Sequence, residues 1–320
     1  MSNMGDMGDM GDLGNMGLFL AGGGGIAFPD RVDLPFVEEL LGSVEAGSGS
    51  WAFSRTGDKT ADLRLPNRSW TDHDWSARWA AWPIFSDYVR TQDYTGVGKG
   101  GAAVTIPDWD PDRTAAEIDS LCRDATDERA DALGEIVAQD GYYEKFLDLF
   151  MTALGVRSGS HGAVERLLHV AGLVGLVVSM YWKANARPKG SARPVPRPRP
   201  NQICPALRPP VAVPGHPSYP SGHACQALLM ACVAEDMLPR SLRQEEECAY
   251  RKLLQTQAFR IARNREIAGL HYRSDTEAGF VLALQVFGQL KQVASYQAAR
   301  EAARQQLEPG FQREARGHSR

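Results

Sequence analysis

The sequence predicts a mainly helical protein, and three observations support that fold class. Between residues 115 and 306, apolar residues recur at intervals of three and four, as on the buried faces of helices. Almost no segment shows the period-two alternation of a half-buried strand. With 43% hydrophobic and 23% charged residues, the 320-residue chain has a globular composition and enough length for one large domain or two ordinary ones.

The expected helices follow one another along the chain. We expect a charged surface helix or helix pair over residues 115–140, and a short amphipathic helix over residues 142–154. A longer, mostly apolar helix is predicted over residues 162–186. Three further helices are predicted over residues 224–237, 241–263 and 276–306.

These helices form one of four predicted regions. Residues 1–17 repeat Met-Gly-Asp and are expected to be a disordered, low-complexity tail. Residues 18–114 contain six of the seven tryptophans and are expected to form an irregular arm whose rings pack on the helical core; an aromatic binding surface is the alternative. Residues 115–306 are the expected helical domain, and residues 307–320 a frayed tail.

Composition also restricts the partners and the location of the protein. A net charge of −4 argues against nucleic acid as the main partner. The five cysteines show no zinc-site spacing, and their odd number fits a reducing compartment better than a disulfide framework. The first residues lack the features of a secretory signal, and no uninterrupted apolar run reaches the roughly 18 residues of a membrane span. We therefore expect a soluble, cytoplasmic protein without a membrane span.

The stretch from Pro214 to Ala224 is the first of three polar clusters. Its three prolines and two glycines prevent a regular helix before Ser221, whereas the apolar run that follows predicts one. Ser221, Gly222 and His223 therefore lie at a loop-to-helix junction, where free backbone N–H groups and the helix dipole favour a tetrahedral oxyanion. A plain helix cap with Ser221 as its N-cap is the alternative interpretation.

The second cluster runs from Arg263 to Asp275. His271 and Asp275 are four residues apart, so on one helical turn the carboxylate can hold one imidazole nitrogen and raise the basicity of the other. Arg265 precedes His271 by six residues, across Gly269, which can serve as a bend. An ordinary surface pair is the alternative.

The third cluster alternates arginine and proline from Arg193 to Pro200. Proline disfavours a helix here and predicts an extended segment. The planar, permanently charged guanidinium group suits oxyanions. The alternatives are a basic polyproline-type linker and a ligand for an SH3-like domain.

Together the three clusters resemble the motifs of one superfamily, which unites type 2 phosphatidic acid phosphatases, bacterial acid phosphatases and vanadium-dependent haloperoxidases. Its motifs are Lys-x6-Arg-Pro, Pro-Ser-Gly-His and Ser-Arg-x5-His-x3-Asp. They match Arg199-Pro200, Pro220-Ser-Gly-His223 and Asn264-Arg265-x5-His271-x3-Asp275 in this chain. The resemblance covers roughly residues 162–288, is nearest to bacterial haloperoxidase-like members, and implies a helical bundle.

The first motif departs from the family, because Ala192 stands where its lysine is expected. Lys189 is nearby. Lys183, at the end of the long predicted helix, can replace the missing lysine if residues 187–196 bulge out as an insertion. Without such a cation, the resemblance does not imply activity.

The resemblance implies a role for each matching residue. His271 would be the nucleophile of a phosphatase, or the single protein ligand of vanadium in a haloperoxidase. Asp275 would orient His271, and His223 would be the acid–base on the opposite side. The remaining residues would bind the oxygens of phosphate or vanadate: Lys183, Arg199, Ser221, Gly222 and Arg265.

Three functions remain open, and we favour a vanadate-dependent haloperoxidase-like enzyme that oxidises halide, preferably bromide, with hydrogen peroxide. His216, five residues before Ser221, is the candidate halide site, because bromide-oxidising members resemble this run with a histidine there. The Trp-rich arm favours the same choice, and the absence of a membrane span argues against lipid phosphatases.

The first alternative is a soluble phosphatase that hydrolyses small phosphomonoesters through a phosphohistidine and needs no cofactor. The second is a non-catalytic helical binding module whose site has lost its lysine. A homo-oligomer also stays open, because the long C-terminal helix can pair with another copy.

Overall fold

Helices make up nearly all regular structure in the described part of the chain. A computed structural model describes residues 75–96, 103–243 and 248–317, all within a unit that runs from Trp75 to Arg320. Among these residues there is no strand, only an isolated parallel bridge between Trp109 and Pro188. The mainly helical fold class is confirmed. The expected tail over residues 1–17, and the arm up to residue 74, lie outside the described residues.

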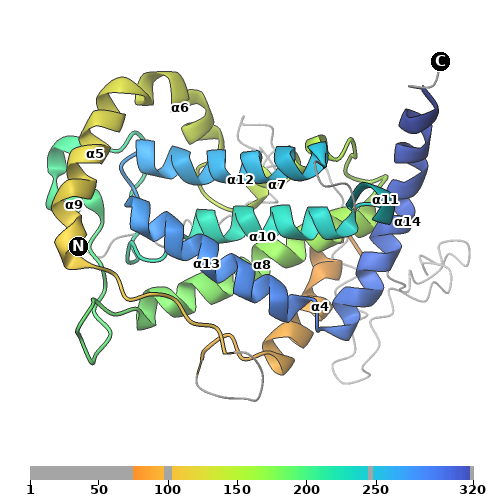
Figure 1. The fold of residues 1–320 in the computed structure, drawn as a ribbon, viewed down its shortest axis with the longest axis horizontal. Helices are drawn as coiled ribbons and strands as arrows, with labels where there is room; N and C mark the ends of the chain where they lie inside the picture. Colours follow the sequence, from red (N-terminus) through yellow and green to blue (C-terminus); the bar gives the residue numbers. More distant parts are fainter. Residues whose placement is uncertain (1–74, 97–102, 244–247, 318–320) are drawn as a thin grey trace, which may run out of the picture. The chain divides into compact units, whose positions relative to one another are not determined.

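Helix α10 (Gly222–Met237) lies at the centre of these helices (Figure 1). It is buried on all sides, because α8 (Gly162–Asn185), α12 (Ala249–Ile267) and α13 (Arg273–Leu290) pack around it. A helix that is apolar all round is typical of such a position. Gly279 of α13 lies so close that a Cβ there would be 2.6 Å from the carbonyl oxygen of Ser221. The starts of α10 and α13 are therefore held against each other.

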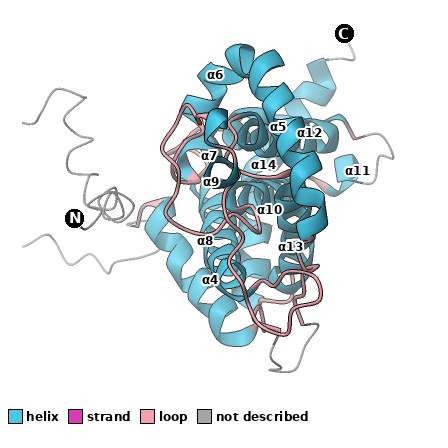
Figure 2. Cartoon of the chain, turned by 90° about the vertical axis from the view of Figure 1, so that its left-hand side faces the viewer, coloured by secondary structure: helices cyan, strands magenta, loops and turns pink. Residues whose placement is uncertain are grey.

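The other helices cover this centre. Three of them pack against α8, namely α4 (Ala77–Thr91), α7 (Glu144–Ala153) and α14 (Ala294–Gly317). The helix pair expected over residues 115–140 is present as α5 (Thr114–Asp127) and α6 (Arg129–Ala138), which contact α12. Figure 2 shows the loops gathered at one end of the helices. The short elements are η2 (Pro111–Arg113), α9 (Pro200–Ile203), η3 (Pro205–Leu207) and α11 (Arg240–Arg243).

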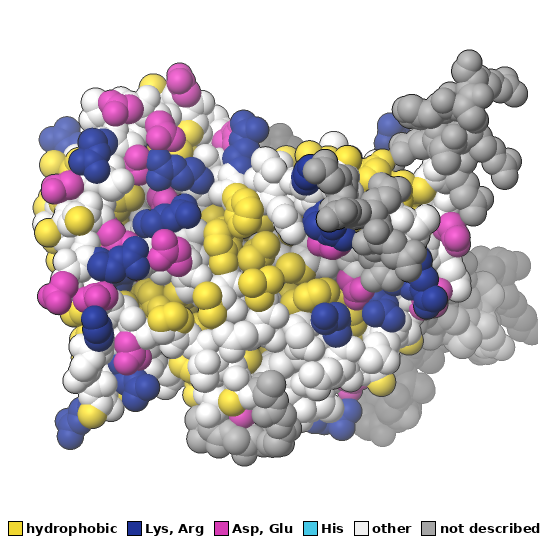
Figure 3. All heavy atoms as spheres, viewed as in Figure 1, with side chains coloured by type: hydrophobic (Ala, Val, Ile, Leu, Met, Phe, Trp, Pro, Cys, Tyr) yellow, Lys and Arg dark blue, Asp and Glu magenta, His cyan; other side chains and the backbone are white. Residues whose placement is uncertain are grey.

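Helices α12 and α13 bury one face and leave apolar side chains on the other. Figure 3 shows these side chains gathered in the middle of the face over the two helices. Phe259 and Leu253 of α12 and Leu284 of α13 are about half exposed, and the rings of Phe259 and Phe280 lie 5.1 Å apart.

The expected irregular arm is wrong for residues 77–91, which form α4. The prediction that its rings pack on the core is also wrong for Trp75, Trp79 and Trp82, which are 50%, 44% and 39% exposed. Helix α4 contacts α8 through smaller residues instead, with Ala81 fully buried. A count of aromatic residues along the chain does not show which face of a helix carries them.

Two expected helices are divided or extended. Residues 276–306 belong to α13 and α14, which are separated by a turn at residues 291–293, and residues 241–263 fall on α11 and α12. The tail expected to be frayed from residue 307 continues α14 to Gly317, in spite of Pro309. Packing stabilises this extension, because Leu307 is buried and the Phe311 ring lies 4.9 Å from that of Tyr250.

Helix α8 contradicts the expectation of a soluble, cytoplasmic protein without a membrane span. By length and composition alone it is able to cross a membrane, with 24 residues and a mean hydropathy of 1.6 in its most apolar window. In the structure 67% of that window is buried, as in a core helix. Polar residues such as His169 interrupt the run, so a count of uninterrupted apolar residues missed it. The cytoplasmic assignment is therefore withdrawn, and so is the argument against lipid phosphatases.

Candidate active site

The loop before α10 joins the first cluster to the second. Ser221 is the N-cap of α10, and its hydroxyl accepts a hydrogen bond from the N–H of Ala224 (3.3 Å). Its own N–H donates to the backbone carbonyl of Asp275 (2.9 Å). Gly222 is the first helical residue, and a Cβ there would meet nothing closer than the Ser179 hydroxyl at 3.4 Å. Packing alone therefore does not demand glycine at this helix N-terminus.

Lys183, near the end of α8, binds the loop at residues 217–220. Its ammonium group donates to the carbonyls of Pro217 (2.8 Å), Ser218 (3.0 Å) and Pro220 (2.7 Å). Burial, followed by the charge of Arg199, holds the pKa of Lys183 well below its usual value. Three carbonyls occupy all three ammonium protons, so in this arrangement Lys183 positions the loop.

The segment after α8 leaves the core and returns to it. The N–H of Val195 donates to the carbonyl of Ala186 (3.1 Å), which closes the excursion between them. This is the bulge expected if Lys183 stands in for the first-motif lysine. Lys189 lies within the excursion, exposed and 3.4 Å from the carboxylate of Asp110.

Arg199 is buried between the first and second clusters. Its Nε donates to the carbonyl of His216 (3.1 Å), Nη1 to the carbonyl of Leu270 (2.9 Å) and Nη2 to Nδ1 of His216 (3.1 Å). Nη1 also lies 3.5 Å from Nε2 of His271. Burial lowers the pKa of Arg199 to about 10. Because this side chain is buried, Arg199 does not belong to an exposed polyproline-type linker or to a ligand for an SH3-like domain.

His271 and Asp275 form the pair expected from their spacing. Nδ1 of His271 lies 3.1 Å from Oδ2 of Asp275. A carboxylate accepts, so Nδ1 carries the proton and Nε2 presents its lone pair toward Arg199. Burial, followed by the charges of Arg199 and Lys183, holds the pKa of His271 well below its usual value. The lowered pKa favours the neutral imidazole, whose Nε2 lone pair faces the guanidinium of Arg199.

Arg265 and His223 are both held by the end of α6. Nη2 of Arg265 donates to the carboxylate of Asp140 (2.8 Å), whereas its Nε and Nη1 are buried without a partner. Nε2 of His223 lies 3.2 Å from the carbonyl of Gln139 and therefore donates to it, which leaves the lone pair on Nδ1. Burial, then the charges of Arg265 and His271, holds the pKa of His223 well below its usual value.

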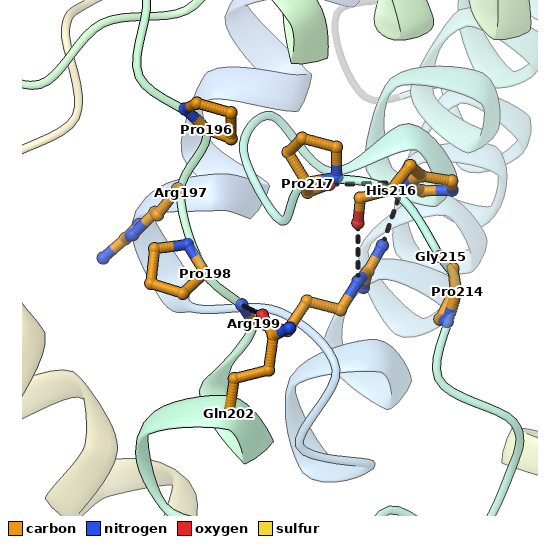
Figure 4. A pocket seen from close by; sticks show the side chains of 9 residues that line it. All are labelled: Pro196, Arg197, Pro198, Arg199, Gln202, Pro214, Gly215, His216 and Pro217. Carbon is orange, nitrogen blue, oxygen red and sulfur yellow. Dashed lines mark hydrogen bonds between the residues drawn. The ribbon is translucent and has the colours of Figure 1, made fainter.

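A pocket with a volume of about 300 Å³ opens beside Arg199 (Figure 4). In Figure 4 the side chain of Arg199 points toward His216, whereas that of Arg197 points away from it. Prolines form much of the wall, and of the predicted site residues Arg199 and His216 line the pocket, whereas His223, His271 and Arg265 do not. The lining residues are Pro196, Arg197, Pro198, Arg199, Gln202, Pro214, Gly215, His216 and Pro217.

Hydrogen bonds join six of the predicted site residues, namely Lys183, Arg199, His216, Ser221, His271 and Asp275, directly or through the Pro217–Pro220 loop. Gly222 follows Ser221 at the start of α10, whereas His223 and Arg265 bind Gln139 and Asp140 at the end of α6. The sequence did not identify Arg197, Ser218 or Asp140 as site residues. Arg197 lies in the arginine-proline run that the sequence marked, but its side chain points away from His216, toward Glu117 and Asp275. No signal marked Asp140, which lies 125 residues from Arg265.

One comparison with known proteins gave a match. Residues 169–298 match the family model described as PAP2 superfamily, a range that includes Lys183 and every later residue of the site. Gln139 and Asp140, which hold His223 and Arg265, precede this range. No curated protein matches the chain. The PAP2 family is mostly membrane-associated, which is a second finding against the cytoplasmic expectation.

Proposed function

The chain belongs to the PAP2 superfamily through residues 169–298, and we propose that its site transfers a phosphoryl group from a phosphomonoester to His271 and then to water. One observation carries this proposal. Nδ1 of His271 lies on Asp275 and its Nε2 faces the buried guanidinium of Arg199. A nucleophilic lone pair thus lies beside a fixed positive charge, as attack on a phosphate ester requires.

The anion would be held by groups around Nε2 of His271. Arg265 offers its buried, unpartnered Nε and Nη1, which are donors in need of acceptor oxygens. The start of α10 offers backbone N–H groups and the Ser221 hydroxyl. Lys183 keeps that loop in place and adds positive charge behind it.

His223 would protonate the departing alkoxide. Without a bound anion, burial and then the charge of Arg265 hold the pKa of His223 well below its usual value. A bound phosphate dianion offsets part of that charge and so raises the affinity of His223 for a proton. The acid form is then populated when substrate is present, and the same ring accepts a proton from the water that hydrolyses the phosphohistidine.

A vanadate-dependent haloperoxidase is the second candidate, and His216 is the observation in its favour. Its Nδ1 accepts from Arg199, so a candidate halide residue touches an anion-binding residue. Among the described residues no group of three or more His, Cys, Asp or Glu could hold a metal cation, but vanadate is an oxyanion and fits the unpartnered donors of Arg265. His271, Arg199, Arg265 and the start of α10 would hold it. Bound vanadate would activate peroxide toward halide.

Two other observations no longer favour the haloperoxidase. The argument from a missing membrane span is withdrawn, because α8 is long and apolar enough to cross one. Trp75, Trp79 and Trp82 of the arm are exposed instead of packing on the core, although Trp109 packs against a buried cluster. We therefore favour the phosphatase over the haloperoxidase, and its candidate substrates include lipid phosphomonoesters.

The test divides one preparation of the full chain among three assays. The first measures phosphate release from p-nitrophenyl phosphate, the second phosphate release from detergent-dispersed phosphatidic acid, and the third bromide-dependent peroxide consumption with added vanadate. We expect phosphate release in the first or second. Bromination without phosphate release would establish the second candidate instead.

The nucleophile is identified by two variants and a trapping step. His271→Ala is expected to lose all measurable phosphate release, whereas His161→Ala, at the start of α8, keeps it. Arg265→Ala is expected to weaken binding of inorganic phosphate by about 10- to 150-fold, the equivalent of about 1.5–3 kcal/mol for lost charge-assisted hydrogen bonds. Rapid quenching with labelled substrate should leave an acid-labile label on His271. A label on another residue, or activity in His271→Ala, would contradict the mechanism.

A further inference from the structure

Asp275 is held by a second buried charge besides His271. Nη1 of Arg197 donates to Oδ1 of Asp275 (2.7 Å) and to the hydroxyl of Ser274 (2.7 Å). Nη2 of the same guanidinium donates to the carboxylate of Glu117 (2.8 Å). Arg197 also lies 3.8 Å from the centroid of the Tyr272 ring. One arginine thus bridges two carboxylates that are 158 residues apart in the chain.

Glu117 fixes the helix from which Asp275 projects. It lies on α5, is buried, and accepts from the backbone N–H of Ser274 (2.7 Å) and from the hydroxyl of Ser274 (3.0 Å). Ser274 is the second residue of α13, where a carboxylate is stabilised by the helix dipole. Glu117 therefore holds both Arg197 and the first turn of α13.

The bridge leaves Asp275 little freedom. Oδ1 is taken by Arg197, while Oδ2 accepts from the Ser218 hydroxyl and from the N–H of Tyr272 (3.0 Å), and faces Nδ1 of His271. Buried charges need partners with matched geometry, and the planar fork of arginine spans two carboxylates at once where the single ammonium of lysine does not. The contacts of Arg197 thus determine which oxygen of Asp275 is presented to His271.

We propose that Glu117 and Arg197 are positioning residues for the His271–Asp275 pair. Through Arg197, Glu117 holds Asp275 so that Oδ2 orients the imidazole and keeps its proton on Nδ1. The catalytic consequence rests on the proposed role of His271 as nucleophile. Helix α5 precedes the residues that match the family model, so this part of the site is contributed by a segment outside that match.

The test compares Glu117→Gln and Arg197→Lys with the wild type. Both variants keep a polar side chain: Glu117→Gln removes the charge that pairs with Arg197, and Arg197→Lys replaces the planar fork by a single ammonium group. We expect kcat for the phosphomonoester to fall about 10- to 100-fold, as for residues that orient a reacting group through another residue, with KM changed less than about 2-fold. Glu277→Gln is the matched control, because Glu277 of α13 is an exposed carboxylate that pairs with Arg113 and Arg273, and its kcat should not change.

A second measurement does not depend on turnover. In protein labelled with ¹⁵N at histidine, the Nδ1 proton of His271 should exchange with water at least about 10-fold faster in both variants than in the wild type, because its acceptor is less well held. Glu277→Gln should leave the exchange rate unchanged. Binding of inorganic phosphate should stay within about 2-fold of the wild type in all three variants.

The outcomes separate this inference from the proposed function. Wild-type kcat and an unchanged exchange rate in folded Glu117→Gln and Arg197→Lys would overturn the positioning role. A rise in KM and weaker phosphate binding at constant kcat would also overturn it, because the pair would then act on the anion. If the wild type hydrolyses no ester but the exchange rates differ as expected, the positioning role stands and the proposed function fails.

Discussion

Gly279 offers a quantitative test of how α10 and α13 fix the site. It lies one turn after Asp275 on α13, and a Cβ at this position would be 2.6 Å from the carbonyl oxygen of Ser221, 3.0 Å from Cβ of Ala224 and 3.2 Å from the nitrogen of Cys225. Two of these three atoms belong to the backbone of α10, which cannot rotate away. In Gly279→Ala the two helices must therefore separate by several tenths of an ångström.

The magnitude follows from two opposing effects. Alanine in place of glycine inside a helix stabilises by about 0.5–1 kcal/mol, and overpacking a close contact costs about 1–3 kcal/mol. Since the neighbours of Gly279 are rigid, the cost takes the upper end, and we expect a net loss of about 2 kcal/mol. For a domain of this size that corresponds to a fall in Tm of about 4–8 °C.

Gly288 is the matched control on the same helix. A Cβ there would meet no atom within 4 Å, so Gly288→Ala should gain about 0.5–1 kcal/mol from helix propensity alone. Thermal unfolding of both variants, followed by circular dichroism, measures the difference, and phosphate release should fall in Gly279→Ala only. A Tm of Gly279→Ala at or above the wild-type value would refute the close packing of α13 on the Ser221 loop.

Two further predictions concern groups near the site. Burial and the charges of Lys183 and Arg199 lower the pKa of His216 to about 4, below its usual 6.5. The unfolded chain therefore takes up a proton first as the pH falls, so stability that is present above about pH 6.5 should be lost toward pH 4. In urea denaturation, His216→Asn should lose about 2–3 kcal/mol less stability than the wild type over that window. Equal losses would contradict the buried, neutral histidine. The sulfur atoms of Cys122 and Cys204 lie 4.0 Å apart, so a thiol oxidant such as a diazene should join them in a disulfide. Mass spectrometry should detect this cross-link in the wild type and not in Cys122→Ser. A wild type without it would contradict the packing of α5 beside α9.

Part of the site could be predicted because its signals are local. The four-residue spacing of His271 and Asp275 puts the two side chains one turn apart, and the structure shows them in contact. Proline and glycine before Ser221 delay the helix, and Ser221 is indeed its N-cap. Backbone geometry over a few residues decides both features, so residue types and spacings are sufficient to predict them.

Other features have no local signal. The sequence marks Lys183 as a cation near the first motif, but only its three carbonyl partners show that it supports the Pro217–Pro220 loop. The division between α13 and α14, and the exposure of the tryptophans on α4, depend on which neighbours each helix meets. The expectation of no membrane span was wrong for α8, because polar residues interrupt its apolar run while its average hydropathy stays high enough for a span.

By itself, the sequence determined the helical character of the chain, the helix start at Ser221 and the residues that resemble the family motifs, since each depends on neighbours within about one turn of helix. Only the tertiary structure decided which charges meet: Arg265 with Asp140, and Arg197 with both Asp275 and Glu117. These partners lie 78 to 125 residues apart along the chain. The packing of α5, α6 and α13 brings them together, and burial then makes each pairing obligatory, because an unpaired charge away from water is too costly to keep.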